Sequence, residues 1–315
     1  AFFLQHLHKG GMQRAVSRIT LELDDAYDCY VVYFGTENPG FAFGGQEINL
    51  DLPGHRKSSF SQKFVQFFQR VKTLQRFVDQ QQIDVLVSFG EPANFMAAFV
   101  RNTKKVCSVR TFIGHSLRGF YGTIYQALIR IVYPRLPRFV VVSEDIGKDL
   151  VDNYGVQKER ISLIHNFYDL PKIQMQSRAE LPTGSENYFG EKSIISAGSL
   201  VEQKGFDHLI RAFARACKEN PGCNLILLGS GPEQQNLREL SAQYGVESHV
   251  HFPGFVENPY AWFARADLFV LCSHLEGFPN VLVEAMACGV PVVATDCKTG
   301  PREILGDSKY GTLIE

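Results

Sequence analysis

The sequence predicts an α/β protein built from two doubly wound parallel sheets. Three observations lead to this fold class. Short runs rich in β-branched residues alternate with helix-period segments along the 315-residue chain. Several of these runs are apolar at consecutive positions, as expected for strands that are covered on both faces. The alternation occurs twice, and a polar segment separates the two series.

The predicted strands follow the apolar runs in chain order. An opening strand precedes the glycine pair Gly10-Gly11, and the closing residues 311–315 have the composition of a last strand with no helix after it. Because the chain also opens abruptly without Met, we expect truncation at both ends. The other strands are predicted at 29–34, 84–89, 105–109, 139–143, 161–165, 193–198, 224–229, 249–252, 268–272 and 291–295.

The predicted helices lie between these strands. Ser143 is expected to cap one of them, because its hydroxyl can accept from a free backbone amide. The segment 61–82 combines an apolar stripe with basic residues that include Arg70 and Arg76. We favour packing against the first sheet, and a position on a membrane surface is the alternative. Helices are predicted at 61–82, 125–133, 146–154, 206–220, 232–244 and 281–288.

The domain boundary is placed in the polar segment 169–192, which holds Pro171, Pro182 and Gly184 and has neither period. We therefore predict a first domain at 1–170, a linker at 171–190 and a second domain at 191–315, truncated at its end. Ligands of doubly wound sheets bind outside the carboxyl ends of the strands. The ligand site is accordingly expected in a cleft between the domains.

Composition excludes several classes of protein. The best candidate for a membrane span, residues 124–142, is interrupted by Arg130, Arg135 and Arg138. The seven cysteines are scattered and lack metal-ligand spacing, which predicts reduced cytoplasmic thiols and no metal site. Residues 1–180 carry 22 Lys and Arg against 17 Asp and Glu. This excess is small, so random surface charge is the favoured interpretation, and peripheral contact with an anionic membrane or a phosphorylated acceptor is the alternative. We predict no nucleic-acid partner.

Glu284 is the most informative residue. It lies in the predicted helix 281–288, where every other residue is apolar or small. A buried carboxylate costs several kcal/mol unless it is paired or hydrogen-bonded. A second acid, Glu276, precedes it in a loop that Gly277 and Pro279 keep from being helical. The free N–H groups of the helix start lie between the two acids, so we expect a ligand with hydroxyls at two places and a phosphate between them. A structural acid bonded to backbone or to a buried Arg is the alternative.

Other candidate residues lie in loops after strands. Gly11 and Gly231 belong to glycine-rich turns that let backbone amides approach a ligand. Lys204 stands at a predicted helix start, where a phosphate is favourable, and an ordinary surface lysine is the alternative. Arg110 follows the strand at 105–109, and His115 comes five residues later. Either side chain is placed to face the cleft, although a lone histidine is more often structural.

Together these residues resemble a known family. The segments 276–280 and 284–292 are similar to the E-x7-E signature of retaining GT-B glycosyltransferases of the family 4 group. Residues 10–14, 204–207 and 229–232 match further landmarks of that family, so the resemblance covers nearly the whole chain. It implies a GT-B fold, with two Rossmann-like doubly wound domains facing across a cleft. The first would take the acceptor and the second the nucleotide sugar.

The resemblance also implies roles for single residues. Glu284 would bind ribose hydroxyls and Glu276 the hydroxyls of the donor sugar, while Lys204 would neutralise the diphosphate. The family usually has Arg where Ser199 stands, so Arg110 or Arg302 would supply the missing cation; the family also often has His near the position of Arg110. Gly231 and Phe255 would lie near the nucleoside, Gly11 near the donor phosphates or acceptor, and the backbone of Gly277, Phe278, Pro279, Asn280 and Val281 at the sugar and diphosphate.

The implied activity is retaining, metal-independent transfer of a hexose or N-acetylhexosamine from a nucleotide sugar, with UDP as the expected nucleotide. The acceptor would be a glycan or a polyprenyl-linked saccharide in polysaccharide assembly, and no cofactor is expected. The enzyme would be cytoplasmic, with peripheral binding to the inner face of the membrane as a further expectation. Alternatives are a sugar-nucleotide epimerase, a phosphorylase or a non-catalytic nucleotide-sugar-binding protein. A nicotinamide-dependent oxidoreductase is disfavoured because Gly10-Gly11 lacks the G-x-G-x-x-G spacing.

Overall fold

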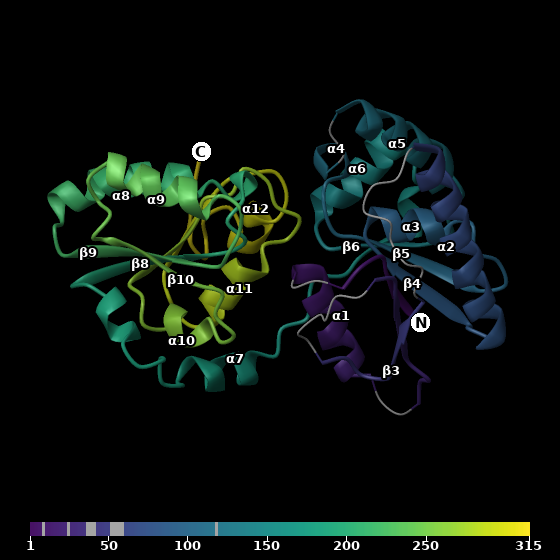
Figure 1. Ribbon diagram of the computed structural model, residues 1–315, viewed down its shortest axis with the longest axis horizontal. Helices are drawn as coiled ribbons and strands as arrows, with labels where there is room; N and C mark the ends of the chain where they lie inside the picture. The colour runs from purple at the N-terminus through teal and green to yellow at the C-terminus, as the bar shows by residue number, and fades with distance from the viewer. Residues whose placement is uncertain (8–9, 24–25, 36–41, 51–59, 117–118) are drawn as a thin grey trace. The chain divides into compact units, whose positions relative to one another are not determined.

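The computed structural model describes the chain except residues 8–9, 24–25, 36–41, 51–59 and 117–118, and except the side chains of residues 60–61, 63–64, 115–116 and 119–121. The chain divides into two compact units, Ala1–Phe167 and Tyr168–Glu315 (Figure 1). Each unit is built around one parallel sheet, of seven strands in the first and six in the second. The predicted pair of doubly wound α/β domains is therefore confirmed.

The first sheet has the strand order β3-β2-β1-β4-β5-β6-β7, and its neighbouring strands are parallel. The chain builds outwards from β1 in one direction and from β4 in the other, so the connections change direction between these two strands. A crevice forms at such a switch point, outside the carboxyl ends of the strands. The strands are β1 (Phe2–Leu4), β2 (Tyr30–Tyr33), β3 (Gln46–Asn49), β4 (Val85–Phe89), β5 (Lys104–Val109), β6 (Phe139–Val141) and β7 (Ile161–Leu163).

Helices cover both faces of the first sheet. Consecutive residues of a strand point to opposite faces, so Leu4 packs with Val16 of α1 while Phe3 packs with Leu74 of α2. The apolar stripe of α2 is thus buried in the core of this unit, as the favoured interpretation predicted. Ser143 caps α6, accepting from the amide of Ile146 at 3.5 Å. The helices are α1 (Gly11–Leu21), α2 (Phe60–Gln80), α3 (Glu91–Ala97), α4 (Ile113–Ser116), α5 (Gly119–Val132) and α6 (Glu144–Tyr154).

The second sheet repeats the pattern with the strand order β10-β9-β8-β11-β12-β13, again parallel. Its switch point lies between β8 and β11, so the loops that follow these two strands flank the crevice. The strands are β8 (Lys192–Ala197), β9 (Cys223–Leu228), β10 (Val250–Gly254), β11 (Leu268–Leu271), β12 (Val292–Thr295) and β13 (Thr312–Ile314).

The second sheet is also covered on both faces, which explains the unbroken apolar runs of its strands. In β9, Leu225 and Leu227 pack against α8 and α9, whereas Ile226 and Leu228 face the core formed with α10 and α11. These helix pairs lie on opposite sides of the sheet in Figure 1. The helices are α7 (Leu170–Ser177), α8 (Phe206–Glu219), α9 (Gln234–Gln243), α10 (Tyr260–Phe263), α11 (Asn280–Ala287) and α12 (Pro301–Leu305).

The segment 171–190, predicted as a linker, has secondary structure of its own. It holds most of α7 and the 3₁₀ turn η3 (Ser185–Tyr188), and the boundary between the units falls between Phe167 and Tyr168. Asp169 accepts from the amide of Lys172 at 2.9 Å, so Asp169 and Pro171 start a helix that the sequence prediction took for a break. Ile173 of this helix is buried in the core of the second unit. The segment therefore belongs to that unit.

No helix in the part of the chain that the structure describes is both long and apolar enough to cross a membrane. All seven cysteines are free thiols. Burial raises the pKa of Cys107 to about 11 and that of Cys288 to about 12, which keeps both thiols protonated near neutral pH.

Candidate functional site

The site forms at the switch point of the second sheet, where the loops after β8 and β11 meet. Lys204 Nζ lies 2.6 Å from Glu276 Oε1, and the Ser273 hydroxyl donates to the same oxygen at 2.6 Å. The Lys204 side chain is 22% exposed and that of Glu276 only 8%. Because both donors use Oε1, the second carboxylate oxygen of Glu276 is available to accept from a ligand hydroxyl.

Hydrogen bonds and close main-chain packing hold the loops after β8 and β11 together. The amide of His274 donates to Gln203 O at 2.9 Å, and Gln203 Nε2 donates to Leu275 O at 2.8 Å. Gly205 has φ +63°, and a Cβ atom there would lie 2.1 Å from the carbonyl oxygen of Cys272. Only glycine permits this approach. The close packing of the main chains therefore fixes the positions from which Lys204 and Glu276 project.

A third loop, after β12, supports the Glu276 segment from another side. The Thr299 hydroxyl donates to the backbone oxygen of Glu276, and Leu275 forms an isolated bridge with Lys298. At Gly300, with φ +93°, a Cβ atom would lie 2.6 Å from Pro279 Cδ. The segment that links Glu276 to α11 is thus held by two other loops, those after β8 and β12.

Helix α11 begins at Asn280, one residue before the predicted start, and its N-cap residue Pro279 makes no side-chain hydrogen bond to it. Amides of its first turn therefore lack a capping side chain, and together they form a site of positive potential. Tyr168 Oη and Asn280 Oδ1 lie 2.7 Å apart, which ties the helix start to the segment before α7. Gly277 and Phe278 place this helix start directly beside Glu276.

Glu284 lies in α11 with no exposed surface, which confirms the prediction of a buried acid in an apolar helix. The Tyr260 hydroxyl donates to Glu284 Oε1 at 3.4 Å. A ligand hydroxyl can reach this carboxylate only if neighbouring side chains move. Its role as a ribose ligand stays a prediction.

The remaining predicted residues of the second unit lie at the same edge of the sheet. Ser199 is exposed in the loop after β8, and Phe255 follows β10 with 47% of its surface exposed. A Cβ atom at Gly231 would lie 2.3 Å from Leu200 O, and one at Gly229 would lie 1.9 Å from Gly198 O. These glycines let the loop after β9 pack on the loop after β8, a structural role that the sequence prediction did not assign.

In the first unit, Gly11 is exposed at the start of α1, and its neighbours His8 and Lys9 lie outside the described residues. Arg110 follows β5, where Nη2 donates to Asn166 Oδ1 and the guanidinium lies 5.8 Å from the centre of the Phe89 ring. The side chain of His115 lies outside the part of the chain that the structure describes. The structure therefore gathers the predicted residues into two sets, one at the carboxyl edge of each sheet.

Arg302, the alternative to Arg110 as the missing cation, is an exposed residue of α12. Its guanidinium pairs with Asp296 and lies 2.7 Å from Asp307 Oδ1. Two carboxylates already balance its charge, so it is poorly suited to neutralise a diphosphate.

Glu91 was missed by the sequence prediction. It is the first residue of α3, directly after β4, and is 6% exposed. Thr111 Oγ1 lies 3.5 Å from Glu91 Oε2, while Oε1 is buried without a hydrogen-bond partner among the described residues. Burial raises the pKa of this carboxyl to about 7. The segment Gly90-Glu91-Pro92 carried a usable signal, because an acid beside Pro after a strand is typical of a helix start.

We expect Glu91→Gln to stabilise the protein at high pH. Between the ordinary Glu value of 4.5 and the folded value of about 7, the folded chain holds a proton that the unfolded chain releases, so stability falls as pH rises. Gln removes this effect, which is worth up to about 3 kcal/mol at 1.36 kcal/mol per pH unit. Urea unfolding at pH 5 and pH 8 measures it, with the exposed Glu22→Gln as control. An equal difference from wild type at both pH values would contradict the buried-acid interpretation.

One group of described side chains has metal-ligating character. The ligand atoms of Asp207, His208 and His274 lie within 4.8 Å of one another at the start of α8 and the loop after β11. Both histidines are exposed, and Arg211 Nη2 lies 3.6 Å from Asp207 Oδ2. The positive charge of Arg211 therefore already balances the negative charge of Asp207.

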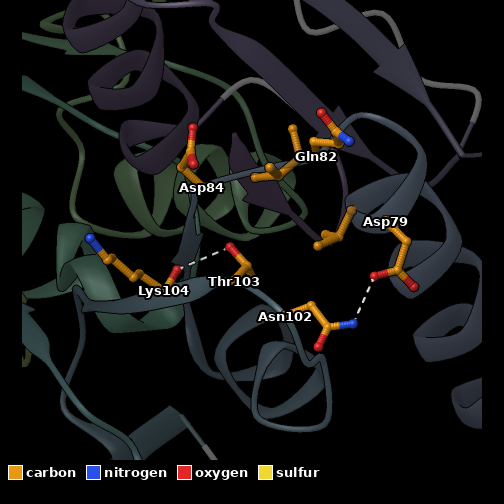
Figure 2. A pocket seen from close by; sticks show the side chains of 8 residues that line it. Asp79, Gln82, Asp84, Asn102, Thr103 and Lys104 are labelled. Atoms are coloured by element: carbon orange, nitrogen blue, oxygen red, sulfur yellow. Dashed lines mark hydrogen bonds between the residues drawn. The ribbon is translucent and has the colours of Figure 1, made fainter.

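A cavity of about 570 Å³ lies at the amino ends of β4 and β5, the edge of the first sheet opposite the loops that follow these strands (Figure 2). Asp79 Oδ1 accepts from Asn102 Nδ2 at 3.2 Å across its rim. Gln82 and Asn102 lie in the two turns that flank the cavity, and both have a left-handed backbone conformation, with φ of 50° and 60°. Ligands of doubly wound sheets bind at the other edge, so this cavity is not part of the candidate site.

Family models match nearly the whole chain. The model described as "Glycosyltransferase Family 4" covers residues 9–172, and that described as "Glycosyl transferases group 1" covers residues 177–315. The chain belongs to glycosyltransferase family 4. The predicted family resemblance is thereby confirmed at this level.

Two of three relatives of this family 4 chain match nearly its full length. An uncharacterized glycosyltransferase of Haemophilus influenzae is 33% identical over 100% of the chain and 85% of its own length. The N-acetylgalactosamine-N,N'-diacetylbacillosaminyl-diphospho-undecaprenol 4-alpha-N-acetylgalactosaminyltransferase of Campylobacter jejuni is 27% identical over 99% of the chain and 85% of its own length. An uncharacterized glycosyltransferase of Methanocaldococcus jannaschii is 33% identical over 65% of the chain, and the match spans 51% of that relative. The chain thus spans about half of the last relative and most of the other two.

Solved structures share the fold. HepE of Anabaena, in complex with UDP and glucose, superposes with a TM-score of 0.75 at 21% identity over 99% of this chain and 84% of its own. The sucrose-phosphate synthase of Thermosynechococcus elongatus has a TM-score of 0.78 at 16% identity, over 99% and 85% of the two chains. The predicted two-domain, Rossmann-like GT-B fold of this family 4 chain is confirmed.

Proposed function

We propose that the chain is a retaining glycosyltransferase that moves a hexose or N-acetylhexosamine from a UDP-sugar to a glycan or polyprenyl-linked acceptor. The observation that carries the proposal is the Lys204–Glu276 pair, 2.6 Å apart, beside the uncapped start of α11. This edge of the second sheet offers a cation, a free carboxylate oxygen and backbone amides. A sugar diphosphate needs all three.

The donor would lie along α11 and the loops around it. Lys204 and the amides of Phe278 to Val281 would bind the diphosphate, and Glu276 Oε2 would accept from a hydroxyl of the sugar. Glu284 would bind the ribose after the side chains around it move, and Gly231 and Phe255 would lie near the uracil. The complex of HepE with UDP and glucose supports this class of donor.

In the reaction, the bond between the anomeric carbon and the diphosphate oxygen breaks, and its electron pair stays on the diphosphate. Lys204 would leave Glu276 to neutralise the new charge, assisted by the positive end of α11. The acceptor hydroxyl would attack the same face of the sugar and pass its proton to the departing diphosphate, which retains the anomeric configuration. A cation on the protein would serve in place of a divalent metal, and Arg110 of the first unit would be the second such cation.

The acceptor is proposed from the relatives and from the charge of the first half of the chain. The Campylobacter relative acts on a saccharide carried by diphospho-undecaprenol, and a Rhizobium meliloti relative is a lipopolysaccharide core biosynthesis glycosyltransferase. A lipid-linked or lipopolysaccharide acceptor would bring the enzyme to the inner face of a membrane. The basic residues of the first unit would favour anionic lipids there.

A thermal-shift panel of UDP-hexoses and UDP-N-acetylhexosamines tests the donor, and NMR of the product tests the mechanism. We expect one donor to raise the midpoint and an α-linked donor to yield an α-linked product. An epimerase would instead isomerise the sugar without acceptor, and a binding protein would saturate without consuming donor. Failure of the whole panel to bind, or an inverted product, would refute the proposal.

We expect Glu284→Gln to abolish most of the donor-induced thermal shift while the protein stays folded. Gln keeps the shape of the side chain but loses the charge with which the carboxylate would accept from two ribose hydroxyls. Tyr260→Phe removes the internal donor to Glu284 and should leave the donor shift in place. A full response of Glu284→Gln to the donor would show that this acid has only a structural role.

A further inference from the structure

A second cavity, of about 330 Å³, opens at the switch point of the first sheet. It lies beside Gln5, which follows β1, and Pro92, which follows β4, and is closed by residues of α2 and α5. Its size falls within the range of small-molecule pockets. Its polar lining includes Gln5, Gln66 and Arg70, and its apolar lining includes Phe67, Phe95 and Met96.

Among the described residues of this lining, Arg70 is the one that carries a charge at neutral pH. It is half-buried, its guanidinium carbon lies 5.3 Å from the centre of the Phe34 ring, and burial lowers its pKa. Within the described residues, no carboxylate forms an ion pair with it. A partly desolvated guanidinium without a counter-charge is unfavourable by itself. The pocket is therefore suited to an anion, and the fork of Arg matches the oxygens of a phosphate.

Aromatic rings lead from the pocket to the protein surface. Tyr125 lies 5.2 Å from Phe95, measured between ring centres, and Phe95 lies 5.5 Å from both Phe67 and Phe99. Phe68 continues the series 5.4 Å from Phe67. The outer rings are not core residues, since Phe68 and Phe99 are 47% and 42% exposed. An exposed apolar path of this kind is typical of a binding surface for an apolar partner.

We propose that this pocket binds the phosphate end of a lipid-linked acceptor, with a phosphate or diphosphate at Arg70 and the first apolar units of the lipid along the rings from Phe95 to Phe68. The cation marks the anionic end of the ligand and the exposed rings mark its apolar end. An acidic sugar would fit less well, because the walls formed by Phe67, Phe95 and Met96 offer its hydroxyls no partners. This inference rests on the proposed transferase function and makes Arg70 a specificity-determining residue for the acceptor.

Calorimetric titration of the whole chain with farnesyl diphosphate, below its critical micelle concentration, tests the pocket. Inorganic diphosphate and farnesol are the comparison ligands. We expect farnesyl diphosphate to bind more tightly than either, because only it engages both Arg70 and the rings. Arg70→Gln should weaken its binding by about tenfold or more, the usual size of a charge-assisted phosphate contact. Phe99→Ala should weaken farnesyl diphosphate but leave inorganic diphosphate unchanged.

Arg76→Gln is the matched control, because Arg76 is an exposed arginine of the same helix. It should change the dissociation constant by less than about twofold, as for a screened surface charge. Equal binding of farnesyl diphosphate by wild type and Arg70→Gln, or binding no tighter than that of farnesol, would overturn the proposal. Should Arg70→Gln fail to fold, Arg70→Lys replaces it: the retained charge should preserve part of the affinity.

The donor assay separates this inference from the proposed function. Arg70→Gln should keep the thermal response to the UDP-sugar, since its pocket belongs to the first unit and the donor residues to the second. Loss of farnesyl diphosphate binding with the donor response intact supports the acceptor pocket. A wild-type protein that ignores all donors refutes the transferase function, whereas the calorimetric comparison of Arg70→Gln with Arg76→Gln still decides whether the pocket binds a lipid phosphate.

Discussion

Lys204→Gln should lower kcat/KM for the donor by about 10²–10³, the usual effect of removing one group that stabilises developing charge. Lys204 is the only cation among the described contacts of Glu276, which lies beside the start of α11, so its loss leaves the departing diphosphate with the backbone amides and the proposed second cation, Arg110. Steady-state kinetics with the UDP-sugar identified in the thermal-shift panel measure this effect. Lys218→Gln, an exposed lysine of α8, should be indistinguishable from wild type.

The loss of Lys204 also leaves Glu276 without its counter-charge, which would destabilise the fold by itself. The double variant Lys204→Gln with Glu276→Gln separates the two effects, because it removes both charges. We expect it to recover the thermal midpoint of the wild type but none of the activity. Recovery of activity in the double variant would mean that neither Lys204 nor Glu276 takes part in the transfer.

Gly205→Ala should produce the largest loss of stability of any alanine substitution in the loop after β8. The new Cβ atom would lie 2.1 Å from Cys272 O, and the residue would keep φ at +63° only under strain. The left-handed conformation costs about 1–2 kcal/mol, and overpacking adds about 1–3 kcal/mol. Because the clash involves backbone, relief requires the loops after β8 and β11 to separate, which moves Lys204 away from Glu276. Thermal unfolding and donor affinity should therefore both fall.

Gly245→Ala is the control for conformation alone. Gly245 has φ +68°, but nothing lies within 4 Å of the position of its Cβ atom. The difference between the two variants measures the clash with Cys272. Equal midpoints for Gly205→Ala and Gly245→Ala would mean that the loops tolerate the extra atom, and that the close approach does not hold the site in place.

Much of the fold followed from periodicity. The apolar runs predicted as strands at 84–89 and 268–272 appear as β4 and β11 with ends shifted by at most one residue. Burial on both faces of a parallel sheet keeps such runs continuous, so the signal is strong in sequence. The helix around Glu284 was predicted for the same reason, since its apolar residues surround a single acid. Interior elements are thus the ones that sequence reveals best.

The elements that were missed lack this signal. Strand β3 lies at the edge of its sheet with an exposed Glu47, so no apolar run marks it. Helix α7 buries only Ile173, and Pro171 in its first turn was taken for a break. Glu91 and Arg70 belong to the first unit, where residues distant in sequence assemble a pocket and a buried acid. Such groupings depend on strand order, which periodicity does not determine.

The site was predicted more completely in the second unit than in the first. Glu276, Lys204 and the start of α11 come together because all three follow strands that meet at the switch point. The direct pairing of Lys204 with Glu276 was not predicted, because a contact across 72 positions leaves no local pattern. The donor to Glu284, the hydroxyl of Tyr260, was missed for the same reason.

The close approaches at Gly205, Gly229 and Gly231 have a consequence for how this enzyme can diversify. At each of them the neighbour that excludes a side chain is a carbonyl oxygen, a group common to all amino acids. The close main-chain packing of the loops that form the site therefore does not depend on the side chains around it, as long as Gly205, Gly229 and Gly231 remain. Exposed positions such as Ser199 are then free to vary, and new contacts to the ligand can arise there by single substitutions without first rebuilding the scaffold.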